Sequence, residues 1–123
     1  MARFNPGLRS EITQYLDYAI IVEGKKDVSS LEALGFEHVY AIHQIAVPLR
    51  SRVEQLSAWI GKKRKVCILT DFDKKGKQLY FLLKTLFQEQ GMKIDSSLRG
   101  VLLKADVSHI EGLAHFMERA ERI

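Results

Sequence analysis

The 123-residue sequence is poor in cysteine, in proline and in long hydrophobic runs. Its single cysteine, Cys67, excludes an internal disulfide and a multi-cysteine zinc site, and its apolar surroundings indicate a reduced, buried thiol. No apolar stretch approaches the roughly 18 to 20 residues that span a bilayer, and the first residues lack the apolar core of a signal peptide. We therefore expect a cytoplasmic protein that does not associate with membranes.

The charge balance of the chain is mildly basic. Nineteen Lys and Arg residues against 15 Asp and Glu residues give a formal net charge of +4 and a pI near 9.3. Such a surface is compatible with a polyanionic partner without identifying one. A hydrophobic content of 46% is sufficient for one buried core in a chain of this length, so we expect one domain.

Segments with a helical hydrophobic period alternate with short apolar segments along the chain. The expected helices cover residues 8–16, 28–34, 49–60, 79–87 and 110–117, and the expected strands cover residues 18–22, 38–42, 66–69 and 101–103. Strands separated by helical crossovers predict an α/β fold with a four-stranded parallel sheet of order 2-1-3-4 and helices on both faces. We expect residues 1–17 to be a helical extension and residues 18–123 the α/β domain, packed as one globular unit.

Acidic side chains follow two of the expected strands. Glu23 ends the run from Ala19, and Asp71 and Asp73 follow the strand at residues 66–69. Because ligands bind at the carboxyl ends of parallel strands, we expect these three carboxylates to converge at one edge of the sheet. They would repel one another unless a cation neutralised them, and their oxygen atoms suit Mg²⁺, with Mn²⁺ as a substitute.

Each acidic turn also contains glycine and lysine. These residues permit close approach of backbone N–H groups and cations to an anion at a helix N-terminus. The residues expected to bind phosphate or substrate are Gly24, Lys25, Lys26, Lys74, Lys75 and Gly76. Asp27 is predicted to be mainly the N-cap of a helix that begins at Val28, with water-mediated metal contact as the lesser alternative.

The two turns resemble the motifs of the TOPRIM domain. Residues 21–27 (IVEGKKD) and 68–76 (ILTDFDKKG) carry the resemblance, which extends over residues 18–111 and is closest to primases, 5S-rRNA maturation ribonucleases and small stand-alone TOPRIM proteins. It implies that Glu23 acts as a general acid or base and can bind metal, and that Asp71 and Asp73 bind Mg²⁺. Glu111 corresponds either to a further family glutamate or to a capping-box partner of Ser108.

The resemblance implies a Mg²⁺-dependent, nuclease-like enzyme that acts on nucleic acid phosphodiesters in RNA processing or in DNA or RNA repair. A non-catalytic nucleic-acid or ribonucleoprotein binding module is the alternative, and RNA and DNA remain equally open. A receiver-type phosphoacceptor domain is disfavoured, because Gly24 and Lys25 follow Glu23 where that domain has paired acids. Topoisomerase chemistry is also disfavoured, because the tyrosines fall at packing positions.

Three further features of the sequence bear on this site. The residue between the two aspartates is Phe72, where relatives more often carry proline or a small residue. His109 has no acidic or hydroxyl partner near it in sequence, so we expect it to be a surface or core histidine. The basic run at residues 62–65 is either a solvated face or a contact for the phosphate backbone.

Overall fold

The chain alternates helices and strands around a parallel sheet. A computed structural model describes residues 7–107, 109–115 and 117. The elements in chain order are α1 (Leu8–Thr13), β1 (Ala19–Val22), α2 (Lys25–Ala33), β2 (Val39–Ala41), α3 (Leu49–Ile60), β3 (Val66–Ile68), α4 (Lys74–Glu89), α5 (Ser97–Lys104) and the 3₁₀ turn η1 (Ile110–Gly112). Within the described residues the sheet has three parallel strands in the order β2-β1-β3. The predicted α/β class with a parallel sheet is confirmed.

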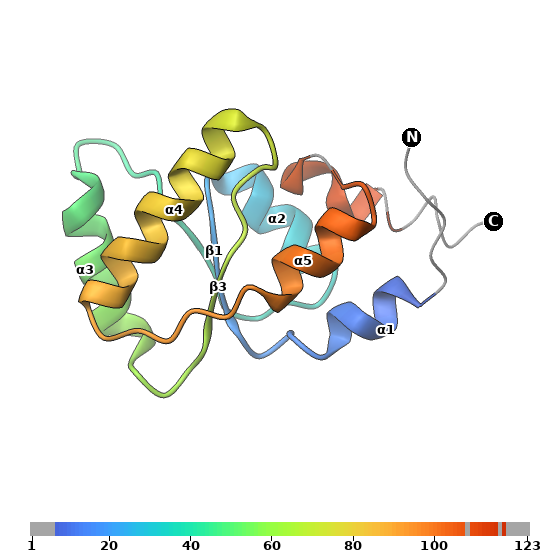
Figure 1. Cartoon of the computed structure of the whole chain (residues 1–123), viewed down its shortest axis with the longest axis horizontal. Helices are drawn as coiled ribbons and strands as arrows, with labels where there is room; N and C mark the ends of the chain where they lie inside the picture. The colour runs from blue at the N-terminus through green and yellow to red at the C-terminus, as the bar shows by residue number, and fades with distance from the viewer. Residues whose placement is uncertain (1–6, 108, 116, 118–123) are drawn as a thin grey trace.

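Helices cover both faces of the sheet, as expected (Figure 1). Ile20 of β1 and Cys67 of β3 face a core cluster shared with α1, α2 and α5. Ile21 and Ile68 face a second cluster shared with α3 and α4. Because successive strand residues point to opposite faces, a strand that is apolar throughout is buried on both sides. This burial accounts for the continuous apolar runs at β1 and β3.

The predicted fourth strand at residues 101–103 is wrong, because these residues belong to α5. Leu98 and Leu102, spaced one helical turn apart, are both buried in the core. A three-residue apolar run is compatible with either element, and burial of this helical face decides for the helix. The place beside β3 is taken instead by Ile94, which forms a single parallel bridge with Val66. The sheet therefore continues past β3 only as this bridge in the described part of the chain.

The first turn of α2 also differs from expectation. Asp27 is not the N-cap of a helix beginning at Val28, because α2 begins at Lys25 and its N-cap is Gly24. Asp27 is the third residue of the helix, and its Oδ2 accepts a hydrogen bond from the Gly24 N–H at 2.9 Å. The Asp27 carboxylate pairs with the Gly24 N–H, which has no partner within the helix, and so favours a helix that begins at Lys25 rather than at Val28.

The C-terminal region begins with η1 where we expected an α-helix from residue 110. Residues 113–115 are helical. Ser108 lies outside the described residues, so the predicted capping box with Glu111 lies outside them too. Across the ranges that the structure describes, no helix is long and apolar enough to cross a membrane.

Candidate functional site

The pairing of β1 with β3 brings their two acidic turns to one edge of the sheet. Ile21 and Ile68 are partners in the parallel register, so the chain leaves both strands on the same side. Glu23 lies directly after β1, and its Oε2 accepts a hydrogen bond from the Asp71 backbone N–H at 2.9 Å. The glutamate carboxylate therefore joins the carboxyl ends of the two strands.

Both aspartates are held by backbone donors. Oδ1 of Asp71 accepts a hydrogen bond from the Ile110 N–H at 3.0 Å, and Oδ1 of Asp73 accepts one from the Gly76 N–H at 2.7 Å. Asp73 is thereby the N-cap of α4. A carboxylate offers about four acceptor positions, so each aspartate keeps its second oxygen for a ligand. The two side chains are fixed in orientation and still able to bind a cation.

Gly76 makes the tight turn between the two aspartates and α4. A Cβ atom at this position would lie 2.0 Å from the backbone oxygen of Asp71. The buried Thr70 hydroxyl donates to the Gly76 carbonyl at 2.6 Å and holds the turn from the other side. Gly24, the glycine of the first acidic turn, has extended backbone, and a Cβ there would meet no described atom within 4 Å. Only the second glycine is therefore required by sterics.

His109 is a surface residue, one of the two positions we expected, but it also lies beside the two aspartates, which we did not predict. Ligand atoms of Asp71, Asp73 and His109 all lie within 4.8 Å of one another. The hydrogen bond from Ile110 to Asp71 explains this approach, because it anchors the residue next to His109. Two carboxylates and an imidazole form a donor set that fits a divalent cation. No signal in the linear sequence reveals this neighbour, since the contact depends on how η1 docks.

Additional acids increase the negative charge at this edge. Asp27 is buried, and this burial is the main cause that raises the pKa of its carboxyl. The charges of Asp71, Glu23 and Glu111 raise the pKa further, whereas the hydrogen bond from Gly24 lowers it. Glu111 is exposed, and its charge is near enough to raise the pKa of Asp27. A bound cation would relieve this repulsion.

Lysines flank the carboxylates on both sides. The exposed lysines lie in the first turns of the two helices that begin at this edge of the sheet, α2 and α4. They are Lys25, Lys26, Lys74 and Lys75. A helix N-terminus already favours anions through its free N–H groups and its dipole, and the lysines add positive charge there. The edge therefore combines a cation site with positions suited to phosphate oxygens.

Sequence reasoning missed Arg99, which supports the aspartate turn from α5. Its half-buried guanidinium donates to the backbone oxygens of Thr70, at 2.6 Å, and Asp71, at 3.2 Å. The same group lies over the rings of Phe72 and Tyr80, at 4.5 and 4.6 Å from their centroids. Burial lowers the pKa of Arg99, although an arginine keeps its charge at neutral pH. No local motif in the sequence marks this contact, because Arg99 reaches the turn only through the packing of α5.

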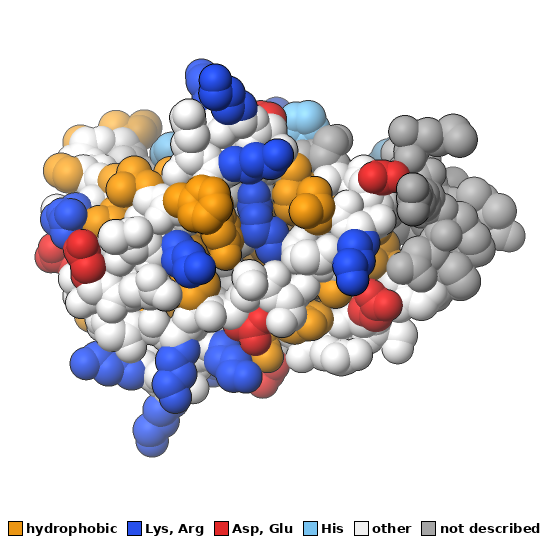
Figure 2. Space-filling view, viewed as in Figure 1, with side chains coloured by type: hydrophobic (Ala, Val, Ile, Leu, Met, Phe, Trp, Pro, Cys, Tyr) orange, Lys and Arg blue, Asp and Glu red, His pale blue; other side chains and the backbone are white. Residues whose placement is uncertain are grey.

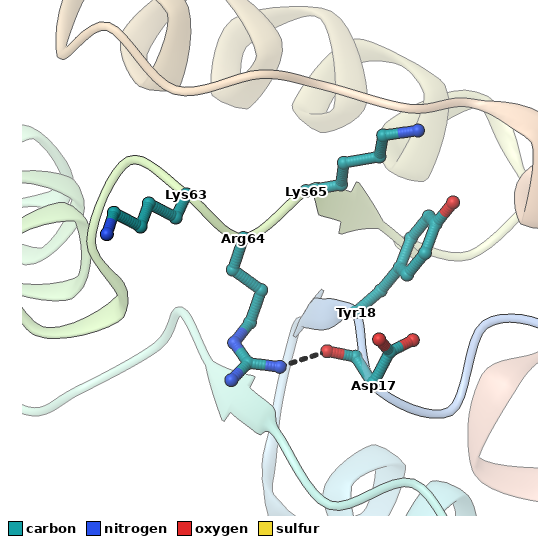
Figure 3. Close-up of a pocket in the computed structure, with 5 residues that line it drawn as sticks. All are labelled: Asp17, Tyr18, Lys63, Arg64 and Lys65. Carbon is teal, nitrogen blue, oxygen red and sulfur yellow. Dashed lines mark hydrogen bonds between the residues drawn. The ribbon is translucent and has the colours of Figure 1, made fainter.

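The basic run at residues 62–65 lies at the opposite edge of the sheet. A cleft of about 400 Å³ is lined there by Asp17, Tyr18, Lys63, Arg64 and Lys65 (Figure 3). Arg64 donates to the backbone oxygen of Asp17, and the Lys65 ammonium lies 5.8 Å from the centroid of the Tyr18 ring. Lys63 and Lys65 point away from each other in Figure 3. These cations therefore do not converge on one anion and do not contribute to the acidic site.

Comparison with known proteins agrees with the fold, and the matched family model spans both acidic turns. The family model of the Toprim domain matches residues 17–96. A UPF0292 protein of Methanocaldococcus jannaschii is 32% identical over 105 residues, which cover 81% of this chain and 78% of the relative. Another from Methanosarcina barkeri is 31% identical over 119 residues, covering 91% and 79%. A solved structure of an Aquifex aeolicus protein has a TM-score of 0.72 and 26% identity, covering 89% of this chain and 98% of that chain. The chain therefore belongs to the Toprim domain family and to the UPF0292 proteins.

Proposed function

We propose that this protein is a Mg²⁺-dependent, nuclease-like enzyme that cleaves phosphodiester bonds in nucleic acid, in RNA processing or in DNA or RNA repair, with Mn²⁺ as a substitute metal. Toprim domains bind divalent metal ions, and proteins of this family act on nucleic acids. The observation that carries the proposal is the convergence of Asp71, Asp73 and His109 within 4.8 Å at the carboxyl edge of the sheet.

The residues of this edge divide into a cation site and a proton-transfer group. Asp71 and Asp73 would hold the cation through the carboxylate oxygens that do not accept backbone hydrogen bonds, and His109 would add its imidazole. When bound, the metal would polarise the phosphate and stabilise developing charge on the leaving oxygen. Metal binding by Glu23 also remains a prediction. Its Oε2 accepts the hydrogen bond from the Asp71 N–H, so Glu23 would bind the metal through Oε1.

Glu23 is the group we assign to proton transfer. The hydrogen bond from Asp71 fixes one carboxylate oxygen and leaves the other to take a proton from the attacking water or return one to the leaving group. Exposed lysines in the first turns of α2 and α4 would position phosphates on either side. The residues we assign to phosphate or substrate are Gly24, Lys25, Lys26, Lys74, Lys75 and Gly76, with Asp27 and Glu111 as additional acids.

Metal binding is tested by calorimetric titration with Mn²⁺ and Mg²⁺. Asp73→Asn keeps a side-chain oxygen that can cap α4, so it removes the charge while preserving the turn. We expect binding to wild-type protein and at least about tenfold weaker binding to Asp73→Asn and to His109→Ala. Asp17→Asn, at the opposite edge of the sheet, serves as the control and should bind as wild type. Wild-type protein that binds neither metal would refute the proposal.

Cleavage is tested with Glu23→Gln, whose amide oxygen can still accept the hydrogen bond from Asp71. We expect cleavage of RNA or DNA to fall by about 100-fold or more while nucleic-acid binding is retained. The alternative is a non-catalytic binding module, which is favoured by one observation: Glu23, Asp71 and Asp73 all accept backbone hydrogen bonds that stabilise the fold. In that case wild-type protein binds nucleic acid without cleaving it.

The proposal extends to domain organisation and location. We assign residues 1–17 to a helical extension and residues 18–123 to the Toprim unit, although residues 1–6, 108, 116 and 118–123 lie outside the part of the chain that the structure describes. Leu8 and Ile12 of α1 are buried in the same core cluster as α5, which supports one globular unit. A cytoplasmic location is supported by the buried, unpaired Cys67 thiol.

A further inference from the structure

An apolar pocket lies between α4 and α5, next to the aspartate turn. It has a volume of about 330 Å³, within the usual range for small-ligand sites. Figure 2 shows hydrophobic and basic side chains intermingled on this face of the molecule, over α4 and α5. The side chains that matter for its chemistry are those of Phe72, Lys77, Tyr80, Phe81, Arg99 and Leu103.

The pocket contains large apolar side chains that folding leaves in water. Phe81 of α4 is 64% exposed and Leu103 of α5 is 55% exposed. Phe81 meets Tyr80 edge to face, with 5.3 Å between ring centroids and an interplanar angle of 82°, so the two rings are not stacked. The exposed face of the Phe81 ring and the exposed Leu103 side chain are both available to a flat ligand. Exposed apolar surface gathered at a pocket indicates a binding site.

The charged groups of the pocket indicate what kind of ligand it takes. Lys77 and Arg99 are its charged lining residues, and both are cations. Phe72 connects the pocket to the metal group, because it is the residue between Asp71 and Asp73. A ligand in the pocket would therefore lie next to the aspartate turn, because Phe72 belongs to both. A pocket with aromatic and aliphatic walls and cations at its rim suits a nucleobase that remains attached to its phosphates, because the base can stack on the walls and the phosphates can contact the cations.

We propose that this pocket receives an unpaired base of the nucleic-acid substrate, so that the enzyme prefers single-stranded segments to fully paired duplex. The inference rests on the proposed function, which places a nucleic acid at the adjoining carboxylates. Bases in an intact duplex are stacked on both sides and cannot enter the pocket without being unpaired. Phe81 supplies the stacking surface, Leu103 the facing wall, and Lys77 contacts the neighbouring phosphate.

The test measures binding of short fluorescent oligonucleotides by anisotropy, with Mg²⁺, in the Glu23→Gln background that does not cleave. The probes are a single strand, a blunt duplex and an abasic strand with the same phosphates and no bases, each as DNA and as RNA. We expect the intact single strand to bind about tenfold more tightly than the abasic strand. Phe81→Ala should weaken binding of the intact strand by about tenfold and leave the abasic strand unchanged.

The control is Trp59→Ala on α3, because Trp59 is a 73% exposed aromatic residue outside the pocket and also contacts a tyrosine edge to face. It should not alter binding of any probe. Equal binding of intact and abasic strands, equal binding of duplex and single strand, or equal effects of Phe81→Ala and Trp59→Ala would overturn the pocket assignment alone. Failure of every probe to bind would overturn it together with the proposed function, whose metal site the calorimetric titration tests separately.

Discussion

Replacement of Gly76 by alanine should damage both the fold and the metal site. The added Cβ would lie 2.0 Å from the Asp71 oxygen and 2.6 Å from the Asp71 carbonyl carbon, whereas real Cβ contacts are essentially never under 3.0 Å. The start of α4 must therefore move by at least about 1 Å against close-packed backbone. This movement disrupts the hydrogen bond from the Thr70 hydroxyl and the cap formed by Asp73.

The energetic terms are each moderate and act together. Forced overpacking costs about 1–3 kcal/mol, loss of the cap about 1 kcal/mol, and loss of a buried hydrogen bond about 1 kcal/mol. We expect Gly76→Ala to lower the free energy of unfolding by about 3–5 kcal/mol. Asp73 is displaced by the same movement, so Mn²⁺ binding by the remaining folded protein should weaken.

Gly24→Ala is the matched control, since Gly24 is the glycine of the other acidic turn. Its backbone is extended and the space for a Cβ is open among the described atoms. Loss of a favourable N-cap residue and reduced entropy of the unfolded chain nearly cancel, so the change should stay within about 1 kcal/mol. Urea unfolding of both variants measures the difference. A Gly76→Ala protein within about 0.5 kcal/mol of wild type would refute the steric reasoning.

Three further predictions concern charged and titratable groups. Arg99→Lys should lower the free energy of unfolding by about 2 kcal/mol in urea, because lysine cannot span two carbonyls and stack on two rings. Arg50→Lys, in an exposed ion pair, should change it by less than about 0.5 kcal/mol, and equal effects would contradict the argument. Asp27→Asn should raise the free energy of unfolding at neutral pH, because burial raises the pKa of Asp27 in the folded protein and so disfavours its charged form. This gain should vanish as the pH falls below 3.8, the ordinary pKa of the group, where Asp27 is protonated in both states. A gain that does not depend on pH would contradict the argument. Burial raises the pKa of Cys67 from 9.0 to about 12, so the free energy of unfolding should fall more between pH 9 and pH 12 for wild-type protein than for Cys67→Ala. Rapid alkylation of the folded protein at pH 8 would disprove this burial.

Local patterns predicted most of the sheet. The β1 and β3 segments are short, apolar and bounded by turn residues, and such runs mark strands that are buried on both faces. The run at residues 101–103 has the same local character but lies in α5. Leu102 of this run and Leu98, four residues before it, pack into the core at helical spacing, and only the assembled core distinguishes the helix from the strand. Short apolar runs therefore carry an ambiguity that tertiary packing resolves.

The candidate site, like the sheet, could be predicted only where its residues belong to a local pattern. Asp71 and Asp73 stand two residues apart in a recognisable motif, and adjacency of β1 and β3 then brings Glu23 to them. His109 and Arg99 belong to no local motif. Their approach depends on a hydrogen bond from η1 and on packing of α5, which are contacts between distant parts of the chain.

The sequence by itself determined that acidic turns would follow two buried strands and that their glycines and lysines would accompany them, because strand period and turn chemistry are local properties. The tertiary structure decided which side chains complete the site. It added His109 to the aspartates, placed Arg99 beneath their turn, and left Phe81 and Leu103 facing a pocket beside them. The physical reason is that these contacts arise from packing between elements, and packing depends on the whole core rather than on any one segment.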